Sequence, residues 1–206
     1  AAAMTGGTTA LAEIGLRPGV PVLPMLAATS PDVATALAEH GGLVSVEWKL
    51  DGARLQVHRF GDEVRLFTRG LHDVTDRLPE VAAVGRELDV RSVVLDAEVI
   101  GLADTDDPER FQHTMAAFAQ DDAQGRSLQL QPFFFDILHL DGEDLIDRPL
   151  TDRREILTGV VGSRIVPGIF TSRPDQAITF AESALAAGHE GVMVKAGESV
   201  YEAGRR

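Results

Sequence analysis

The stretch Glu47-Trp48-Lys49-Leu50-Asp51-Gly52-Ala53-Arg54 decides the fold that we expect for this chain. Residues 43–46 before it are of β type, and apolar and polar side chains alternate after it in residues 55–58. Two such runs joined by a short Asp-Gly connection predict a β-hairpin. Turn chemistry alone explains an Asp-Gly pair, so the pair by itself indicates no function.

Lys49 gives the same stretch a chemical role beyond a turn. A lysine that is held at a hairpin mouth and partly desolvated can lose its proton and attack an electrophile. The chain has only two lysines, Lys49 and Lys195. The stretch resembles the nucleotide-attachment motif of the covalent nucleotidyltransferases, which include ATP-dependent DNA ligases, RNA ligases and mRNA capping enzymes. The resemblance implies that Lys49 is the catalytic nucleophile.

Length and composition predict one folded domain. A chain of 206 residues suffices for one domain, with or without a short appendage. No run approaches the roughly 18 apolar residues of a membrane span, and the first residues lack the pattern of a signal peptide. The absence of cysteine excludes disulfides and thiolate metal sites. We therefore expect a cytoplasmic location, no membrane association and, by default, a monomer.

The net charge and the N-terminal residues predict that further segments accompany this domain. A net charge of −13 argues against a free-standing nucleic-acid binder, because neutralising phosphates requires clustered lysine and arginine. Residues 1–24 are small and punctuated by glycine and proline, and we expect a linker or the tail of a preceding DNA-binding domain there. Residues 25–206 are expected to form the folded unit.

Periodicity along the folded unit predicts an α+β class with mainly antiparallel strands. The expected strands are 43–49, 53–59, 64–68, 92–100, 128–140, 165–170 and 192–194. The expected helices are 30–41, 79–88, 109–118, one beginning at Thr151 as N-cap, and 174–187.

Three further segments follow Lys49 in the family's order. Phe67-Thr68-Arg69 ends a strand, and the resemblance implies that Arg69 contacts the nucleotide; a solvated tip is the plain alternative. Asp96 and Glu98 share one face of a strand, and Glu98 is implied to address the ribose and the metal unless both face water on an edge strand. In Phe133–Asp136, Phe135 is implied to stack on adenine, a contact of roughly 1–3 kcal/mol, whereas Phe134 packs in the core.

The last two segments complete the implied site. Glu190 is implied to hold the metal and Lys195 to lie near a phosphate, although a turn and a core strand with a snorkelling lysine also explain them. Arg206 matches a phosphate-binding arginine. Glu47 is assigned to adenine recognition through its position two residues before Lys49, and Arg54 to the phosphate clamp.

The resemblance covers residues 22–206 and is strongest to the adenylation domain of bacterial ATP-dependent DNA ligases of the three-domain kind. It implies an ATP-grasp-like nucleotidyltransferase fold of two mainly antiparallel sheets flanked by helices, with the nucleotide in the groove between them. It implies ATP, Mg²⁺ or Mn²⁺, and nicked duplex DNA held mostly by flanking domains. The final motif and an oligonucleotide-binding domain are expected beyond residue 206.

The implied reaction is attack of Lys49 on the α-phosphate of ATP to give a lysyl-AMP, which then serves to seal nicks in replication, repair or recombination. Such attack requires a neutral amine, in-line positioning and neutralised phosphates. Two alternatives stay open: an RNA ligase or capping guanylyltransferase core, which nucleotide choice would distinguish, and a non-catalytic nucleotide-binding platform. An NAD-dependent ligase is disfavoured because too few residues precede Lys49.

Overall fold

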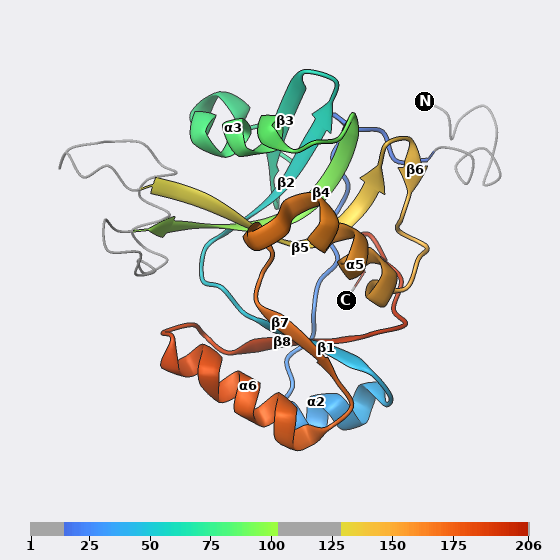
Figure 1. Ribbon diagram of the computed structural model, residues 1–206, viewed down its shortest axis with the longest axis vertical. Coiled ribbons are helices and arrows are strands. Elements are labelled where there is room, and N and C mark those ends of the chain that lie inside the picture. The colour runs from blue at the N-terminus through green and yellow to red at the C-terminus, as the bar shows by residue number, and fades with distance from the viewer. Residues whose placement is uncertain (1–14, 103–128, 206) are drawn as a thin grey trace.

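Two antiparallel sheets form the body of the structure, a computed structural model that describes residues 15–102 and 129–205 (Figure 1). The larger sheet has the strand order β3-β2-β4-β5-β6 and the smaller one β7-β1-β8. The larger sheet contains β2 (Ala53–Phe60), β3 (Glu63–Thr68), β4 (Ser92–Leu102), β5 (Gln129–Leu140) and β6 (Glu143–Asp144). The smaller sheet contains β1 (Val44–Trp48), β7 (Gly168–Thr171) and β8 (Val192–Ala196).

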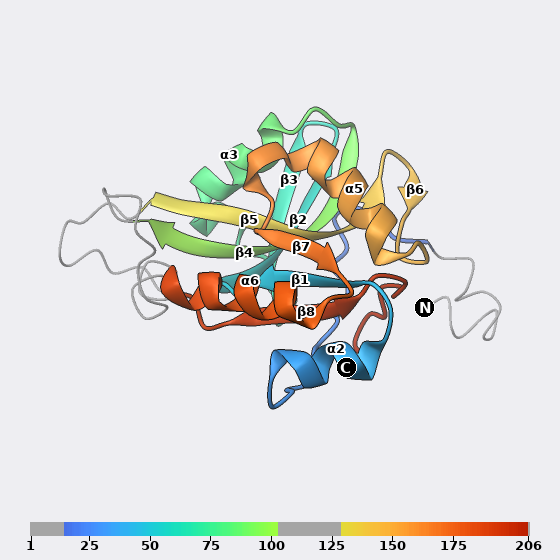
Figure 2. The ribbon, with the colours of Figure 1, turned by 60° about the horizontal axis from the view of Figure 1, so that its bottom comes forward.

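The described residues form four α-helices, and each sheet carries two of them. The helices are α2 (Val33–His40), α3 (Pro79–Glu87), α5 (Leu150–Val161) and α6 (Pro174–Ala186), with short 3₁₀ turns η1 (Thr75–Arg77) and η2 (Gly162–Arg164). Helices α3 and α5 pack on the larger sheet, and α2 and α6 pack on the smaller sheet (Figure 2). The sheets therefore lie between two pairs of helices, which confirms the expected α+β class.

Four apolar clusters hold the described layers together, the fourth around Val94, Leu138 and Tyr201. The largest joins the larger sheet to α3 and α5 and includes Phe134, which is fully buried as predicted. A second joins β1 to α2 and α6 through Leu37 and Ala177. The third contains Leu50 and Phe135 and joins the connection between the two sheets to β5. This third cluster adjoins the residues that the sequence singles out.

The expected hairpin around Lys49 is wrong. Strand β1 pairs with β7 on one edge and with β8 on the other, while β2 pairs with β3 and β4 in the other sheet. Both edges of β1 are thus occupied, and residues 49–52 carry the chain from one sheet to the other. Alternation predicted both strands correctly, but it carries no information about which strands pair.

Most other elements lie where the sequence predicts them, with two differences. Helix α5 begins after Pro149 as N-cap, and Thr151 lies inside the helix without a capping role. Strand β7 is shorter than expected, because residues 165–167 precede it outside any strand. The expected helix at 109–118 lies outside the described residues. Strand β4 is the middle strand of its sheet, so the edge-strand alternative for Asp96 and Glu98 does not hold.

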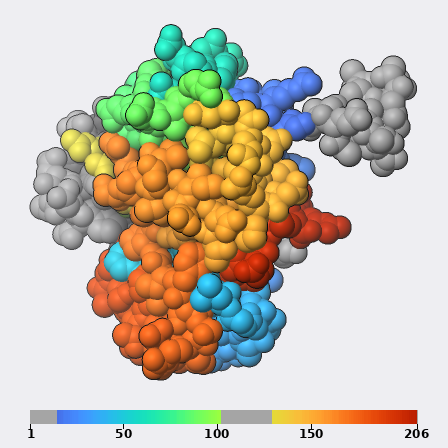
Figure 3. Space-filling view, turned by 45° about the vertical axis from the view of Figure 1, so that its right-hand side comes forward, coloured from blue at the N-terminus to red at the C-terminus, as the bar shows by residue number. Residues whose placement is uncertain are grey.

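The two ends of the described chain lie side by side on the larger sheet. Both backbone groups of Val22 bond to the amide of Gln56, and the N–H of Leu26 donates to the carbonyl of Arg205 at 2.7 Å. Residues 15–24 are therefore packed against the domain. In the space-filling view, residues 129–165 cover the middle of one face, above α2 and α6 (Figure 3). Within the described part of the chain, no helix is long and apolar enough to cross a membrane.

Candidate active site

Lys49 lies at the start of the connection between the two sheets. Its backbone N–H donates to the carbonyl of Gly191 at 2.9 Å, which fixes the residue beside the turn before β8. Its side-chain amine forms an ion pair with the carboxylate of Glu190. The two side chains are 48% and 45% exposed. A ligand can therefore reach the amine, and it would meet Glu190 at the same point.

Gly52 brings this connection close to β4. A Cβ atom at this position would lie 2.2 Å from the backbone oxygen of Val99, so only glycine fits. The backbone N–H of Gly52 hydrogen-bonds to the carboxylate of Glu98. Burial raises the pKa of Glu98 to about 7, and the Arg54 charge and the Gly52 N–H act in the opposite direction. The protonation state of Glu98 therefore depends on the charged and hydrogen-bonding groups that surround its carboxyl group.

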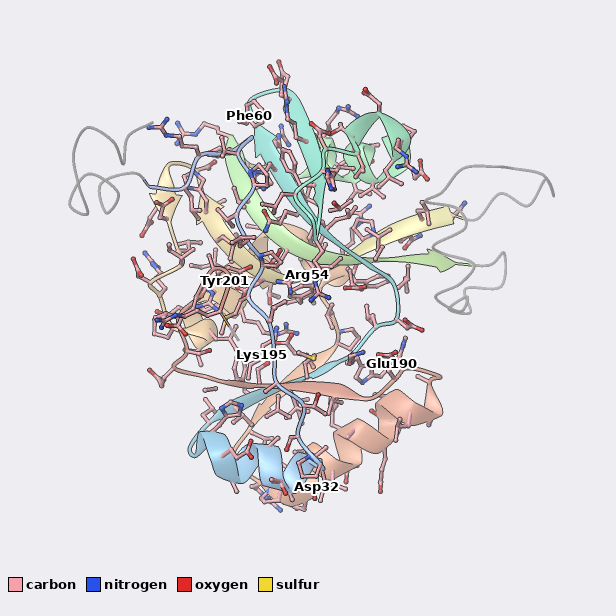
Figure 4. All side chains as sticks on the ribbon, turned by 180° about the vertical axis from the view of Figure 1, so that it is seen from behind. Asp32, Arg54, Phe60, Glu190, Lys195 and Tyr201 are labelled. Carbon is pink, nitrogen blue, oxygen red and sulfur yellow. The ribbon has the colours of Figure 1, made fainter. Side chains whose placement is uncertain are left out.

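Arg54 is held by a buried network on the larger sheet. Its guanidinium donates to Asp96 Oδ2 at 2.8 Å and to the carbonyl of Met25 at 2.7 Å. The hydroxyl of Tyr201 donates to the same Asp96 oxygen at 2.6 Å, and it accepts from the N–H of Met25 at 3.1 Å. Figure 4 shows Arg54 and Tyr201 close together, with Lys195 on the smaller sheet below. Burial of the hydroxyl beside the Asp96 charge raises the pKa of Tyr201, which keeps it a donor.

Two cations flank the ring of Phe135. The Arg54 Cζ atom lies 5.2 Å and the Lys195 Nζ atom 5.0 Å from the ring centroid. The ring is only partly buried, in the third apolar cluster with Trp48 and Leu50. Phe135 therefore combines a flat apolar surface with adjacent positive charge, a combination that suits an aromatic ligand carrying phosphates.

Glu47 is buried, and its carboxylate is fully engaged. It accepts from the Ser45 hydroxyl at 2.8 Å and from Lys195 Nζ at 2.6 Å, and Arg154 lies 3.2 Å away. Only 2% of the Glu47 side chain is exposed. The carboxylate expected to recognise adenine thus faces Lys195 and Arg154 here.

Two predicted residues are not joined to this group. Arg69 lies in the exposed turn after β3, and among the described residues no contact connects it with Lys49. Arg206 lies outside the described residues. An open depression of about 520 Å³ lies between β7 and α6, and none of the predicted site residues lines it.

A divalent cation such as Mg²⁺ needs oxygen ligands that converge on one point. Among the described residues, no three acidic or histidine side chains converge. Mg²⁺ is usually bound by one or two carboxylates together with substrate phosphates. Glu190 and Glu98, on either side of the Lys49 connection, fit that smaller requirement.

The structure adds partners that the sequence analysis did not assign. Asp96 and Tyr201 hold Arg54, and Arg154 approaches Glu47. Asp96 lies two residues before Glu98 and Tyr201 five residues before Arg206, so their closeness in sequence to predicted site residues was a usable signal. Arg154 has no such signal, since the Arg153-Arg154 pair looks like the polar start of a helix.

Comparisons with known proteins place the chain among DNA ligase sequences. Residues 24–206 match the family described as "ATP dependent DNA ligase domain". The chain is 50% identical to a "Probable DNA ligase" of Pseudarthrobacter chlorophenolicus, over 99% of this chain and 40% of that protein. It is 46% identical to a "Probable DNA ligase" of Nocardia farcinica, over 100% of this chain and 43% of that protein.

A solved structure shares the fold. The structure titled "mycobacterial DNA ligase D complexed with ATP and MES" superposes with a TM-score of 0.70 and 28% identity, covering 90% of this chain and 57% of that one. By the coverages given above, the chain spans less than half the length of the two curated relatives. Since the family match extends over nearly all of the described residues, the chain belongs to the ATP dependent DNA ligase domain family.

Proposed function

We propose that this chain is the adenylation core of an ATP-dependent DNA ligase that seals nicks in duplex DNA. The observation that carries the proposal is the position of Lys49, a half-exposed amine in the connection between two sheets, ion-paired to Glu190. The family membership and the ATP complex of the similar mycobacterial ligase support ATP as the nucleotide.

In the first step, Lys49 Nζ attacks the α-phosphorus of ATP. A nitrogen–phosphorus bond forms, the bond from the α-phosphorus to the bridging oxygen breaks, and pyrophosphate leaves. The attacking amine must be neutral, so its proton has to leave before or during the attack. In the structure the ammonium is paired with the Glu190 carboxylate, so this ion pair has to open before the attack.

The remaining residues position the nucleotide. Phe135 supplies the surface for the base, and Arg54 and Lys195 beside the ring supply positive charge for ribose and phosphate oxygens. Glu98 and Glu190 would hold a Mg²⁺ or Mn²⁺ ion, which supplies charge neutralisation at the phosphates. The proposed role of Glu47 changes from adenine recognition to holding Lys195, because its carboxylate bonds to that amine.

In the later steps, a 5′-phosphate oxygen at the nick attacks the AMP phosphorus and the nitrogen–phosphorus bond breaks. The 3′-hydroxyl then attacks the activated 5′-phosphate, forms the phosphodiester and releases AMP. We expect nicked duplex DNA to be held mostly by flanking segments, because the chain is strongly acidic. A monomer is the expected state.

The test compares nucleotides and substrates. A longer version of the chain, of the length of the curated relatives, would be incubated with ATP or GTP and with nicked DNA or nicked RNA. We expect the protein to seal nicked DNA with ATP, to leave nicked RNA unsealed and not to use GTP. Sealing of RNA, or use of GTP, would instead support the RNA ligase or capping alternatives.

A further inference from the structure

A buried arginine stands behind the Glu47–Lys195 pair. Arg154 lies on α5, and its side chain is 8% exposed. One guanidinium nitrogen donates to the carbonyl of Val166 at 2.5 Å, and the other lies 3.2 Å from Glu47 Oε1. That second nitrogen is buried and has no hydrogen-bond partner in the described residues. Its ion pair with Glu47 therefore rests on the attraction of opposite charges and not on a well-aligned hydrogen bond.

The two cations share one carboxylate. Glu47 Oε1 faces Arg154, and Glu47 Oε2 accepts from Lys195 Nζ at 2.6 Å. Lys195 is the outermost member, 22% exposed and 5.0 Å from the Phe135 ring centroid. The cluster thus runs from a buried arginine through a buried glutamate to a lysine at the edge of the candidate nucleotide site.

The local backbone leaves room for this arrangement. A Cβ atom on Gly168, which pairs with Glu47 across β7 and β1, would lie 2.7 Å from the Arg154 guanidinium and 3.0 Å from Glu47 Cγ. The absence of a side chain at position 168 lets an arginine of α5 reach a glutamate of β1.

Charge explains why a second cation matters. Glu47 and Lys195 alone would form a neutral pair, and a lysine neutralised at 2.6 Å attracts a phosphate weakly. With Arg154 the cluster carries two positive charges and one negative charge. Arg154 is enclosed by protein and little screened by solvent, so its charge offsets that of Glu47. The net positive charge of the cluster then lies at Lys195.

We propose that Arg154 is a positioning residue that neutralises Glu47 and so leaves the charge of Lys195 available to the nucleotide phosphates. The inference rests on the proposed nucleotide site and adds a residue to it. Arg154 makes no contact with the nucleotide in this account. It acts through Glu47, on the affinity for phosphate and not on the affinity for the base.

The test measures affinity for two ligands that differ in phosphate. Binding of adenosine and of α,β-methylene-ATP, which cannot transfer AMP to Lys49, would be measured by calorimetry with Mg²⁺ present. Arg154→Met makes the cluster neutral, so we expect α,β-methylene-ATP to bind roughly tenfold more weakly while adenosine binding stays unchanged. Arg154→Met with Glu47→Gln restores one net positive charge, and we expect triphosphate affinity to return toward that of the original chain.

Two further variants separate charge from folding. Arg153→Met removes the neighbouring buried arginine, which pairs with Asp136 at 2.8 Å, and should leave the ratio of triphosphate to adenosine affinity unchanged. Glu47→Gln alone keeps a similar shape and removes the negative charge, so we expect tighter triphosphate binding. This single variant decides the matter if Arg154→Met does not fold.

The outcomes distinguish this inference from the proposed function. If the original chain binds neither ligand, the nucleotide site itself is refuted, and this inference with it. If the original chain binds both but Arg154→Met weakens both equally, Arg154 has only a structural role. A double variant weaker than Arg154→Met, or a Glu47→Gln variant that loses triphosphate affinity, would also overturn the role of charge.

Discussion

The amine of Lys49 forms an ion pair with the carboxylate of Glu190, a residue far along the chain in the turn before β8. The backbone bond from Lys49 to Gly191 holds the two segments together, so the pair does not depend on flexible side chains alone. An ion-paired ammonium is not a nucleophile, whereas the amine that remains after proton transfer is one. Attack by Lys49 therefore requires that the ammonium first give up its proton.

Lys49→Ala should abolish formation of the AMP adduct and leave the fold intact. The Lys49 side chain is 48% exposed, and the loss of an exposed ion pair costs about 0–1 kcal/mol. Mass spectrometry after incubation with ATP and chemical denaturation would measure the two effects. Residual adduct in this variant would place the chemistry on another side chain.

Phe134→Ala should lower the stability of the fold, whereas Phe135→Ala should weaken nucleotide binding. Phe134 is fully buried in the largest core cluster, so its removal should lower the free energy of unfolding by roughly 3–5 kcal/mol. Phe135 is partly buried beside two cations, and its removal should weaken adenosine binding by roughly 1–3 kcal/mol. Denaturation and calorimetry on both variants would check this. Equal adenosine affinity in the original chain and Phe135→Ala would remove the ring from the site.

Tyr201→Phe should destabilise the protein through Asp96. The hydroxyl donates to a buried carboxylate at 2.6 Å, and a hydrogen bond to a charged group contributes about 1.5–3 kcal/mol. Ser183→Ala, which removes an exposed hydroxyl on α6, is the control and should change stability by less than about 0.5 kcal/mol. Urea denaturation measures both values, and equal stabilities would show that Asp96 does not need this donor.

Stability should decline between pH 6.5 and pH 4 through His58. Burial lowers the pKa of His58 to about 4, with a smaller contribution from His139. The ring is kept neutral: Nδ1 accepts from the Gly19 N–H, and Nε2 lies 3.3 Å from Gln56 Oε1. Because the folded-state pKa is below the unfolded value, the unfolded chain binds the proton first as pH falls. The stabilisation is present above pH 6.5 and lost progressively toward pH 4, on the order of 3 kcal/mol.

His58→Gln should remove this part of the pH dependence and lower stability at neutral pH. The exposed His72 provides the control, since His72→Gln should keep the slope of the original chain. The measurement is the free energy of unfolding at a series of pH values from 4 to 7.5. An unchanged slope in His58→Gln would assign the acid sensitivity to other groups.

The elements of the fold could be predicted from the sequence, but their pairing could not. Alternation located β2 and β3, and these two strands, joined across Gly61-Asp62, pair with each other. The Asp-Gly connection after Lys49 has similar local chemistry, yet it links two different sheets. The difference lies in β7 and β8, which occupy both edges of β1 and come from the end of the chain.

The candidate site shows the same division. Motif order selected Lys49, Arg54, Glu98, Phe135 and Glu190, and the structure gathers these residues at the meeting point of the two sheets. It did not reveal that Glu47 is engaged by Arg154 and Lys195, because these pairs form only in the folded chain, where side chains from α5 and β8 reach β1. Spacing identifies residue types suited to a reaction, whereas the partners that set their charge come from distant segments.

The most direct test of the account is the mass of the protein after incubation with ATP and Mg²⁺, followed by peptide mapping. It would be done on this chain and on a version extended to the length of the curated relatives. We predict one AMP per molecule, attached to Lys49, with Lys195 unmodified. An extended protein that carries no AMP, or carries it elsewhere, would contradict the central claim that Lys49 is the nucleophile of an adenylation core.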